Sequence, residues 1–146
     1  MKNYERILMS LNFNDFMKSK EWILTDGAIG TNLFEMGLSS GDSPELWNET
    51  EPVKVKMLHK SFVEAGSEII LTNSFGANSS RLKLHGAGQR AYEISKISAE
   101  LAREIADQSS NKIAVAGSIG PTGEILSPIG DFKTEFATEI FHEQAE

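Results

Sequence analysis

The feature that most constrains the fold is a regular alternation of short apolar segments with helical patterns. Strand-like segments occur at residues 22–24, 68–72 and 112–116, and a polar loop and then a helix-like stretch follow each of them. Such alternation is typical of parallel strands joined by right-handed helical crossovers, so we predict an α/β fold. The continuous apolar centre of the second segment predicts burial on both faces of that strand.

The stretches between these segments predict several helices. Residues 1–20 have a broken helical periodicity and are expected to form an N-terminal helical arm, which leaves residues 21–146 for the α/β part. A helix is expected from Thr31, a second from Pro52 to Gly66, and others over residues 89–107 and 135–146. Residues 37–51 form a connection that is unusually long for its place, and long ordered loops are often functional.

Composition excludes several classes of partner. The formal net charge of −7 argues against nucleic acid and acidic membranes, which both require a basic surface. No apolar run approaches the ~20 residues that span a bilayer, and the N-terminus lacks the apolar core of a signal peptide, so a cytoplasmic protein is expected. The sequence has no cysteine, which excludes disulfides and thiolate metal ligands within this chain.

Polar loops follow all three strand-like segments, at Asp26–Gly27, at residues 73–76 and at residues 117–123. Because the carboxyl ends of parallel strands share one edge of a sheet, these loops are expected to converge there. Backbone N–H groups of glycine-rich loops can bind a carboxylate, and Asp26 can accept from an ammonium group. The combination suits an amino acid better than a phosphate, although each loop alone is as typical of a structural turn.

Other chemistries have less support. Residues 117–123 read G-x-x-G-x-x-G, which is not the spacing of a dinucleotide-binding loop. The three histidines, His59, His85 and His142, are not paired at metal-ligand spacing, so packing or surface roles are expected. No arrangement of Ser, His and Asp has its members at strand ends.

With these loops assembled, the sequence resembles the homocysteine S-methyltransferase family. The matching segments are LTDGAIGTNL (24–33), HKSFVEAGS (59–67), LTNSFGA (71–77) and AGSIGPTGE (116–124), with a further likeness at residues 141–146. Within the family the closest likeness is to bacterial enzymes described as betaine–homocysteine methyltransferases, at residues 32–38, 43–48 and 77–84. The resemblance implies a (β/α)8 TIM barrel, in which a zinc ion held by cysteines binds homocysteine as a thiolate that attacks a cationic methyl donor.

The resemblance also implies which residues bind substrate. The carboxylate after the first strand matches the group that contacts the homocysteine amino group, the three residues after it match the backbone that meets the substrate carboxylate, and three more match the pocket wall. These residues are Asp26, Gly27, Ala28, Ile29, Asn73, Phe75 and Ser118. No residue matches a catalytic group or a zinc ligand, because the family's zinc-binding cysteines lie in later strands.

The chain therefore looks like an N-terminal fragment with about the first three βα units. A complete barrel needs about 250 residues, against the 146 of this chain. We expect the isolated chain to be inactive, because it lacks the zinc ligands and the remaining strands. Its partners are expected to be homocysteine and a methyl donor; the sequence does not indicate an oligomeric state.

Betaine is the predicted donor, with alternatives left open. Animal betaine enzymes have an aromatic residue where this chain has Gly76, and a cationic donor favours an aromatic cage. Trp47, on the long connection, is equally a candidate substitute or a packing residue. The alternatives are the homocysteine-binding part of a folate/corrinoid methionine synthase, an S-methylmethionine-dependent enzyme, or, in a different class, an amino-acid-binding module without chemistry.

Overall fold

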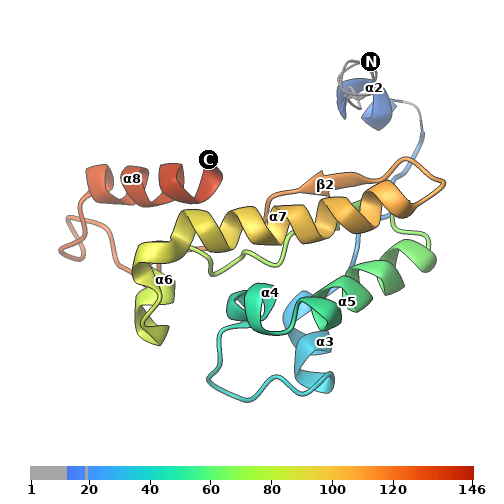
Figure 1. Ribbon diagram of the computed structural model, residues 1–146. Coiled ribbons are helices and arrows are strands. Elements are labelled where there is room, and N and C mark those ends of the chain that lie inside the picture. The colour runs from blue at the N-terminus through green and yellow to red at the C-terminus, as the bar shows by residue number, and fades with distance from the viewer. Residues whose placement is uncertain (1–12, 19) are drawn as a thin grey trace, which may run out of the picture.

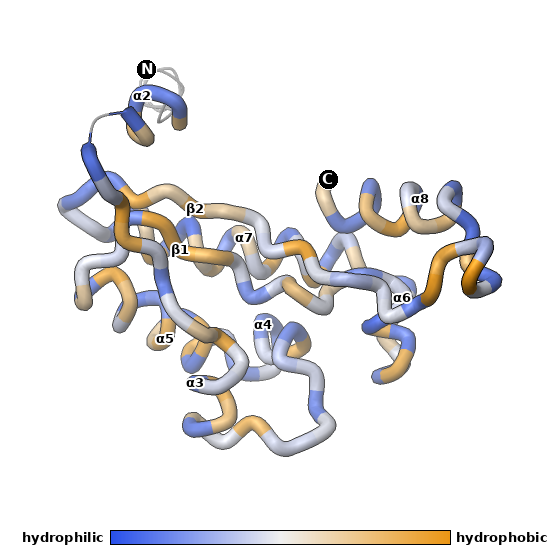
Figure 2. The backbone as a smooth tube through the Cα atoms, turned by 180° about the vertical axis from the view of Figure 1, so that it is seen from behind, coloured by the Kyte–Doolittle hydropathy of each residue, from blue (hydrophilic) through white to orange (hydrophobic). Residues whose placement is uncertain are grey.

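A computed structural model describes residues 13–18 and 20–146 of the chain. The predicted N-terminal arm lies largely outside these residues, and its described part contains helix α2 (Phe13–Lys18). In the rest of the chain, extended segments form one layer and helices cover one side of it (Figure 1). Seen from behind, β1 and β2 lie in front of α5 and α7 (Figure 2).

The order of elements follows the predicted alternation, with short additional helices. The elements after α2 are α3 (Ile29–Glu35), η1 (Pro44–Leu46), α4 (Trp47–Thr50), α5 (Pro52–Glu64), β1 (Ile69–Leu71), α6 (Ser79–Leu82), η2 (Lys83–His85), η3 (Gly88–Arg90), α7 (Ala91–Gln108), β2 (Ala114–Ala116) and α8 (Thr134–Ala145). The helices predicted from Pro52, over 89–107 and over 135–146 are confirmed as α5, α7 and α8. The short helices in the long connection and after β1 were not predicted.

The two strands pair in parallel, as predicted, with Leu71 opposite Ala116. The predicted first strand at residues 22–24 is not formed; instead Thr25 makes an isolated parallel bridge to Ile69. The Asp26 backbone N–H donates to the Ile69 carbonyl at 3.0 Å, so the segment still runs beside β1. The Leu24 carbonyl also accepts from the Glu68 N–H at 2.8 Å, just before β1 begins.

Burial of β1 on both faces is a prediction that the structure corrects. Ile70 is fully buried and packs with Ala102 and Ala106 of α7. Ile69 and Leu71 alternate with Ile70 along the strand, so they point to the other face, and they are only partly buried. The helices cover one side of the layer (Figure 2). Burying a side chain such as that of Ile70 contributes about 1.5–3 kcal/mol, so this face anchors the strands to the helices.

Helix α5 illustrates how local sequence sets an element's limits. Pro52 occupies its first position, where a missing N–H leaves no hydrogen bond unmade. Val55 and Leu58 form its buried stripe, and Gly66, at a φ of +103°, turns the chain out of the helix. The helix therefore ends where the sequence predicted and delivers the chain directly into β1.

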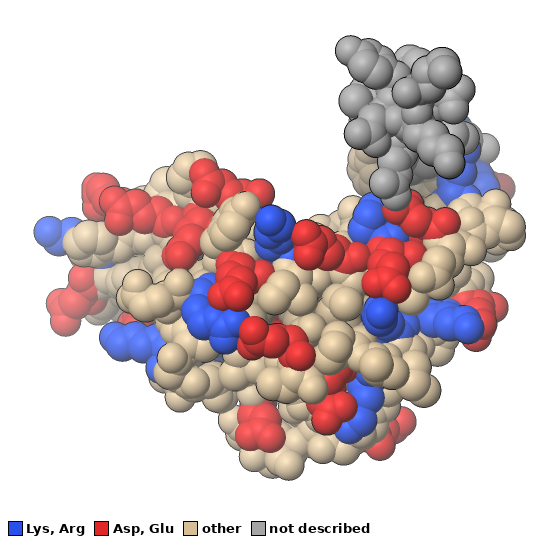
Figure 3. All heavy atoms as spheres, viewed as in Figure 1, with Lys and Arg blue, Asp and Glu red and all other residues tan. Residues whose placement is uncertain are grey.

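The surface of the helical side carries mixed charges. Figure 3 shows basic and acidic side chains beside one another on this face. The ion pairs include Lys56 with Glu104 at 3.1 Å and Arg90 with Glu49 at 2.7 Å. Within the described part of the chain, no helix is both long and apolar enough to cross a membrane.

Candidate functional site

Three segments leave the sheet at one edge, as the sequence predicted. Thr25 lies beside Ile69, and Leu71 lies beside Ala116, so the residues that follow each segment emerge on the same side. They bring together Asp26, the second-strand loop (residues 72–76) and the third-strand loop (residues 117–120). The site is built from these three loops and from the connection before α5.

Asp26 is the one carboxylate of this edge that follows directly from the first segment. Its Oδ2 accepts a hydrogen bond from the Leu71 backbone N–H at 2.8 Å. Its Oδ1 is buried and has no hydrogen-bond partner among the described residues. Desolvation by burial raises the pKa of Asp26 above its ordinary value, against the lowering effect of the Leu71 hydrogen bond. One oxygen is thus fixed and the other is left for a donor that the described residues do not supply.

The three residues after Asp26 lead into α3. A side chain at Gly27 would begin 3.2 Å from the Phe62 ring, so glycine leaves this corner uncrowded. Ala28 is extended, with φ −67° and ψ 111°, and its side chain cannot cap the helix that starts at Ile29. The first-turn N–H groups of α3 therefore have no side-chain cap.

Asn73 ties the second-strand loop to the long connection. Its side-chain amide donates to the Pro44 carbonyl at 2.8 Å and to Asn48 Oδ1 at 3.0 Å. In return, Asn48 Nδ2 donates to the Asn73 carbonyl at 2.8 Å. Both asparagines are almost fully buried. The amide nitrogen of Asn73, a predicted wall residue, is therefore already engaged within the protein.

Glu45 makes the next contact between the same two segments. Its side chain is buried, with 7% of the residue exposed. Oε1 accepts from the Gly76 backbone N–H at 2.7 Å, and Oε2 accepts from Ser43 Oγ at 2.6 Å. This buried carboxylate therefore has a donor on each oxygen, both supplied by the loops it joins.

The third-strand loop holds the second-strand loop from the opposite side. Ser74 Oγ donates to the Ser118 carbonyl at 2.8 Å, and the Ser118 N–H donates to Thr72 Oγ1 at 2.9 Å. The Gly120 N–H donates to the Phe75 carbonyl at 2.8 Å. Ser118, another predicted wall residue, thus contacts the loop through its backbone.

Phe75 lies at the surface of this network, with its ring over Gly120. It is 59% exposed, although the residues on either side of it are held. Gln144 of α8 adds a further contact, since its Nε2 donates to the Ser74 carbonyl at 2.7 Å. The sequence did not identify the supporting residues Glu45, Asn48, Ser74 and Gln144. The available signal was the long connection itself, whose residues 43–48 carried part of the family likeness.

Trp47 has the packing role that the sequence had left as one of two options. Its side chain packs against the cluster of Leu33, Leu38 and Leu58. The Lys54 ammonium lies 4.4 Å from the centre of its ring, so one face of the indole is already covered by a cation.

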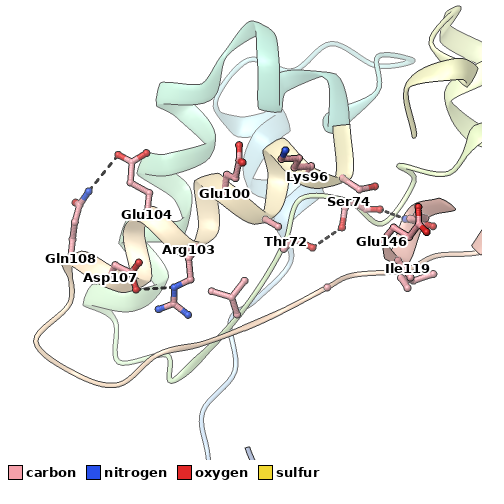
Figure 4. Close-up of a pocket in the computed structure, with 16 residues that line it drawn as sticks. Thr72, Ser74, Lys96, Glu100, Arg103, Glu104, Asp107, Gln108, Ile119 and Glu146 are labelled. Carbon is pink, nitrogen blue, oxygen red and sulfur yellow. Dashed lines mark hydrogen bonds and ion pairs between the residues drawn. The ribbon is translucent and has the colours of Figure 1, made fainter. Parts of the chain in front are cut away.

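A wide groove of about 890 Å³ lies along α7 and β2, and Thr72, Ser74 and Gly117 of the strand-end loops also line it (Figure 4). Charged side chains of α7 line it, among them Arg103, which pairs with Asp107 at 2.9 Å. None of the seven predicted substrate residues lines this groove. A smaller cavity of about 420 Å³ lies beside Phe75 and Gly76, bounded also by Arg81 and His85. Size alone therefore does not identify the substrate site.

The residues present do not fit a zinc site. Over the described ranges there is no cluster of three or more His, Cys, Asp or Glu side chains that could hold a metal ion, and the sequence lacks cysteine. His59 is fully buried in α5 without a hydrogen-bond partner in the described part, and burial lowers its pKa to about 4. His59 is therefore a packing residue, which is one of the two roles expected for the histidines. His142 is exposed and lies 3.6 Å from Glu146.

Comparison with known proteins gives consistent matches. A profile of the family described as homocysteine S-methyltransferase matches residues 23–146. The methionine synthases of Mycobacterium tuberculosis (strain ATCC 25618 / H37Rv) and Mycobacterium leprae (strain TN) are 34% and 31% identical to this chain, each over 82% of it. The chain spans only 10% and 11% of the length of these two relatives.

Solved structures match as well. The homocysteine methyltransferase MmuM from Escherichia coli in its metallated form has a TM-score of 0.75 and 22% identity, over 90% of this chain and 51% of that one. The oxidized form has a TM-score of 0.60 and 27% identity, over 73% of this chain and 40% of that one. The mixed α/β arrangement described above is therefore the one found in homocysteine methyltransferase structures.

Proposed function

The chain belongs to the homocysteine S-methyltransferase family, and we propose that it forms the homocysteine-recognising part of an enzyme that converts homocysteine to methionine. The observation that carries the proposal is the Asp26 carboxylate. Leu71 fixes one of its oxygens, and the other is buried without a partner among the described residues. Buried polar groups are almost always hydrogen-bonded, so an unpartnered oxygen at a strand-end edge suits a ligand ammonium group.

The remaining predicted residues would enclose the amino acid. The backbone of Gly27, Ala28 and Ile29 would meet the substrate carboxylate, supported by the uncapped first turn of α3. The exposed ring of Phe75 would contact the aliphatic part of the substrate. Asn73 and Ser118 would contribute by holding the wall in place, since their hydrogen bonds are to neighbouring loops.

Methyl transfer requires a thiolate, because a thiol is mostly protonated at neutral pH and the thiolate is the nucleophile. In the transfer, a bond forms between sulfur and the methyl carbon while the bond between that carbon and the donor breaks. The residues of this chain bind and orient the amino-acid end, and we assign none of them to activating the sulfur. The isolated chain is therefore expected to bind homocysteine without turnover.

The donor proposal has two forms. Betaine is the first candidate, from the likeness to bacterial betaine–homocysteine methyltransferases. The 34% identity to a methionine synthase favours a second candidate, the homocysteine-binding part of such an enzyme. Because Lys54 covers one face of Trp47, a cage for betaine would need other aromatic side chains, and Phe75 is an exposed one on this edge. To separate the two candidates, the longest available form of the protein is incubated with homocysteine and either methyl-labelled betaine or a methyl-labelled folate. The labelled methionine formed from each donor is then measured.

The binding proposal is tested by titrating the chain with L-homocysteine and monitoring heat or amide resonances. Asp26→Asn keeps an acceptor for Leu71 but loses the charge, so affinity should fall about tenfold or more. The control ligand is 4-mercaptobutyrate, which lacks the amino group and should bind both forms equally weakly. Equal affinity of both forms for homocysteine would overturn the assignment of Asp26.

The cytoplasmic location of the protein, expected from its sequence, stays a prediction.

A further inference from the structure

We propose that Glu45 is a positioning residue, which fixes the backbone of the second-strand loop and thereby sets the direction of the Phe75 side chain. The proposal deepens the function proposed above and rests on it for the identity of the pocket's ligand. It concerns a residue on the long connection, outside all three strand-end loops. The argument has four steps, each based on contacts around the peptide group between Phe75 and Gly76.

The first step is the burial of the Glu45 carboxylate. A carboxylate removed from water is costly unless its oxygens are hydrogen-bonded. Here the Gly76 N–H donates to Oε1 at 2.7 Å, and the Ser43 hydroxyl donates to Oε2 at 2.6 Å. Hydrogen bonds to an ionised acceptor are roughly twice as strong as neutral ones, so this contact is well suited to hold a loop.

The second step is that one peptide group is held at both ends. The Phe75 carbonyl accepts from the Gly120 N–H at 2.8 Å, and the Gly76 N–H donates to Glu45. These two groups belong to the same planar peptide unit. Two separate segments, one before α5 and one after β2, therefore fix the plane that follows the Phe75 α-carbon.

The third step is the absence of space at Gly76. A β-carbon there would lie 2.8 Å from Glu45 Oε1 and 3.1 Å from Cδ. Any side chain at position 76 would displace the carboxylate that holds it. Glycine at 76 and glutamate at 45 are therefore mutually dependent, and a change at either position should alter the effect of a change at the other.

The fourth step is the environment of the Phe75 ring. The residue is 59% exposed, and its ring lies over Gly120, where a β-carbon would be 2.7 Å from both Cδ1 and Cε1. Gly120 also donates to the Phe75 carbonyl, so the ring keeps this place only while the 75–76 peptide keeps its orientation. Asn73 and Ser74 have their own hydrogen bonds to other segments, so removing Glu45 should free the Gly76 N–H end of the 75–76 peptide without unfolding the loop.

The test compares Glu45→Ala, Glu45→Gln, Gly76→Ala and the double variant Glu45→Ala/Gly76→Ala in the 146-residue chain. Glu49→Ala is the control, because Glu49 lies on the same connection but pairs with Arg90 on the surface. Homocysteine affinity is measured well below each melting temperature, and the Gly76 amide and Phe75 ring resonances are recorded in parallel. Since Gln keeps an acceptor for Gly76, it should retain affinity, while Glu45→Ala and Gly76→Ala should each lose about tenfold.

The double variant should lose less affinity than the two single losses multiplied together. In Gly76→Ala the new β-carbon clashes with the Glu45 carboxylate, and Glu45→Ala removes that carboxylate and with it the clash. Wild-type affinity in Glu45→Ala, or losses that merely track its unfolded fraction, would overturn the proposal. If the wild-type chain does not bind homocysteine, the proposed function fails instead. The positioning role is then decided by the Phe75 ring resonances, which should shift in Glu45→Ala and not in Glu45→Gln; unchanged ring resonances in Glu45→Ala would overturn it.

Discussion

The helix-covered side and the strand-end edge of this molecule bury polar groups in opposite ways. Within the helices, His59 and Ser98 are fully buried, and neither side chain has a hydrogen-bond partner among the described residues. At the edge, Glu45, Asn48 and Asn73 are buried and hydrogen-bonded to neighbouring loops. The difference follows from the backbone: helices satisfy their own N–H and C=O groups, whereas loops need side chains to do so.

A buried polar group without a hydrogen-bond partner is therefore interpreted differently in the helical layer and at the strand-end edge. A neutral imidazole inside the helical layer acts as packing volume and avoids charge by a lowered pKa. At the edge, the loops supply many hydrogen-bond donors. Within the described part of the chain, the buried side-chain oxygens there that still lack a partner are Asp26 Oδ1 and Gln144 Oε1. Asp26 is the one that can carry a charge, and so it is the one that we assign to a ligand.

The largest expected effect tests the helical side by pH. His59 has a folded pKa of about 4 against an ordinary value of 6.5, so the unfolded chain binds the proton more tightly. Its contribution is therefore present above pH 6.5 and is lost as pH falls from 6.5 towards 4, about 3 kcal/mol in all. Denaturant unfolding at pH 7 and 4.5 measures the loss, and His59→Phe should abolish this part of it. An identical pH dependence in both proteins would contradict the packing interpretation.

The next effect tests the crowding of the edge. A β-carbon at Gly120 would lie 2.5 Å from the Phe75 carbonyl oxygen, so Gly120→Ala must push two loops apart. We expect a loss of about 1–3 kcal/mol in the free energy of unfolding. Gly117→Ala is the matched control, because nothing lies within 4 Å of its β-carbon position. Similar melting temperatures for the two variants would mean that the loops are not closely packed.

A smaller effect tests the hydrogen bonds that replace backbone pairing. Asn48→Ala leaves the buried Asn73 carbonyl without its donor, which should cost about 1–2 kcal/mol. Asn111→Ala, at an exposed position after α7, should change stability by less than about 0.5 kcal/mol. Thermal unfolding of the two variants side by side makes the comparison. A harmless Asn48→Ala would show that this pair does not support the edge.

The smallest expected effect on stability is at Asp26. Its pKa is raised in the folded state, so ionisation opposes folding, and that cost grows as pH rises from 3.8 through the raised pKa. Asp26→Asn removes the charge and keeps an acceptor for Leu71, so stability at pH 7 should be unchanged or slightly higher. Melting temperatures at pH 7 and below pH 4 provide the check. Marked destabilisation at pH 7 would show that the charge serves the fold rather than a ligand.

The sequence predicted those parts of the fold that depend on local signals. Helix α5 has Pro52 at its start, Gly66 after its end and a regular apolar stripe between them, so it needed no tertiary information. The strand at residues 22–24 could not be predicted reliably, because a strand also needs a neighbour to pair with, and Thr25 makes only one bridge. The parallel order was correct because alternation constrains topology more strongly than it constrains strand length.

The candidate site divides in the same way. Asp26 was identifiable because a carboxylate directly follows an apolar run at a strand end. Glu45 and Gly76 are 31 positions apart, and Asn48 and Asn73 are 25 apart. The packing of helices and strands decides which polar side chains meet across the loops. The periodicity of one sequence contains no signal of these pairings. The role of Trp47 likewise needed the positions of Leu33, Leu58 and Lys54.

The hydrogen bond from Gln144 to Ser74 has a consequence for the order of events during protein synthesis. The two residues are 70 positions apart, so Ser74 leaves the ribosome well before its partner exists. Chains fold as they emerge, from the N-terminus onward, at about 5–20 residues per second. The loop that carries Phe75 therefore passes several seconds with its Ser74 carbonyl open to water, and it gains this last support only when α8 has been made.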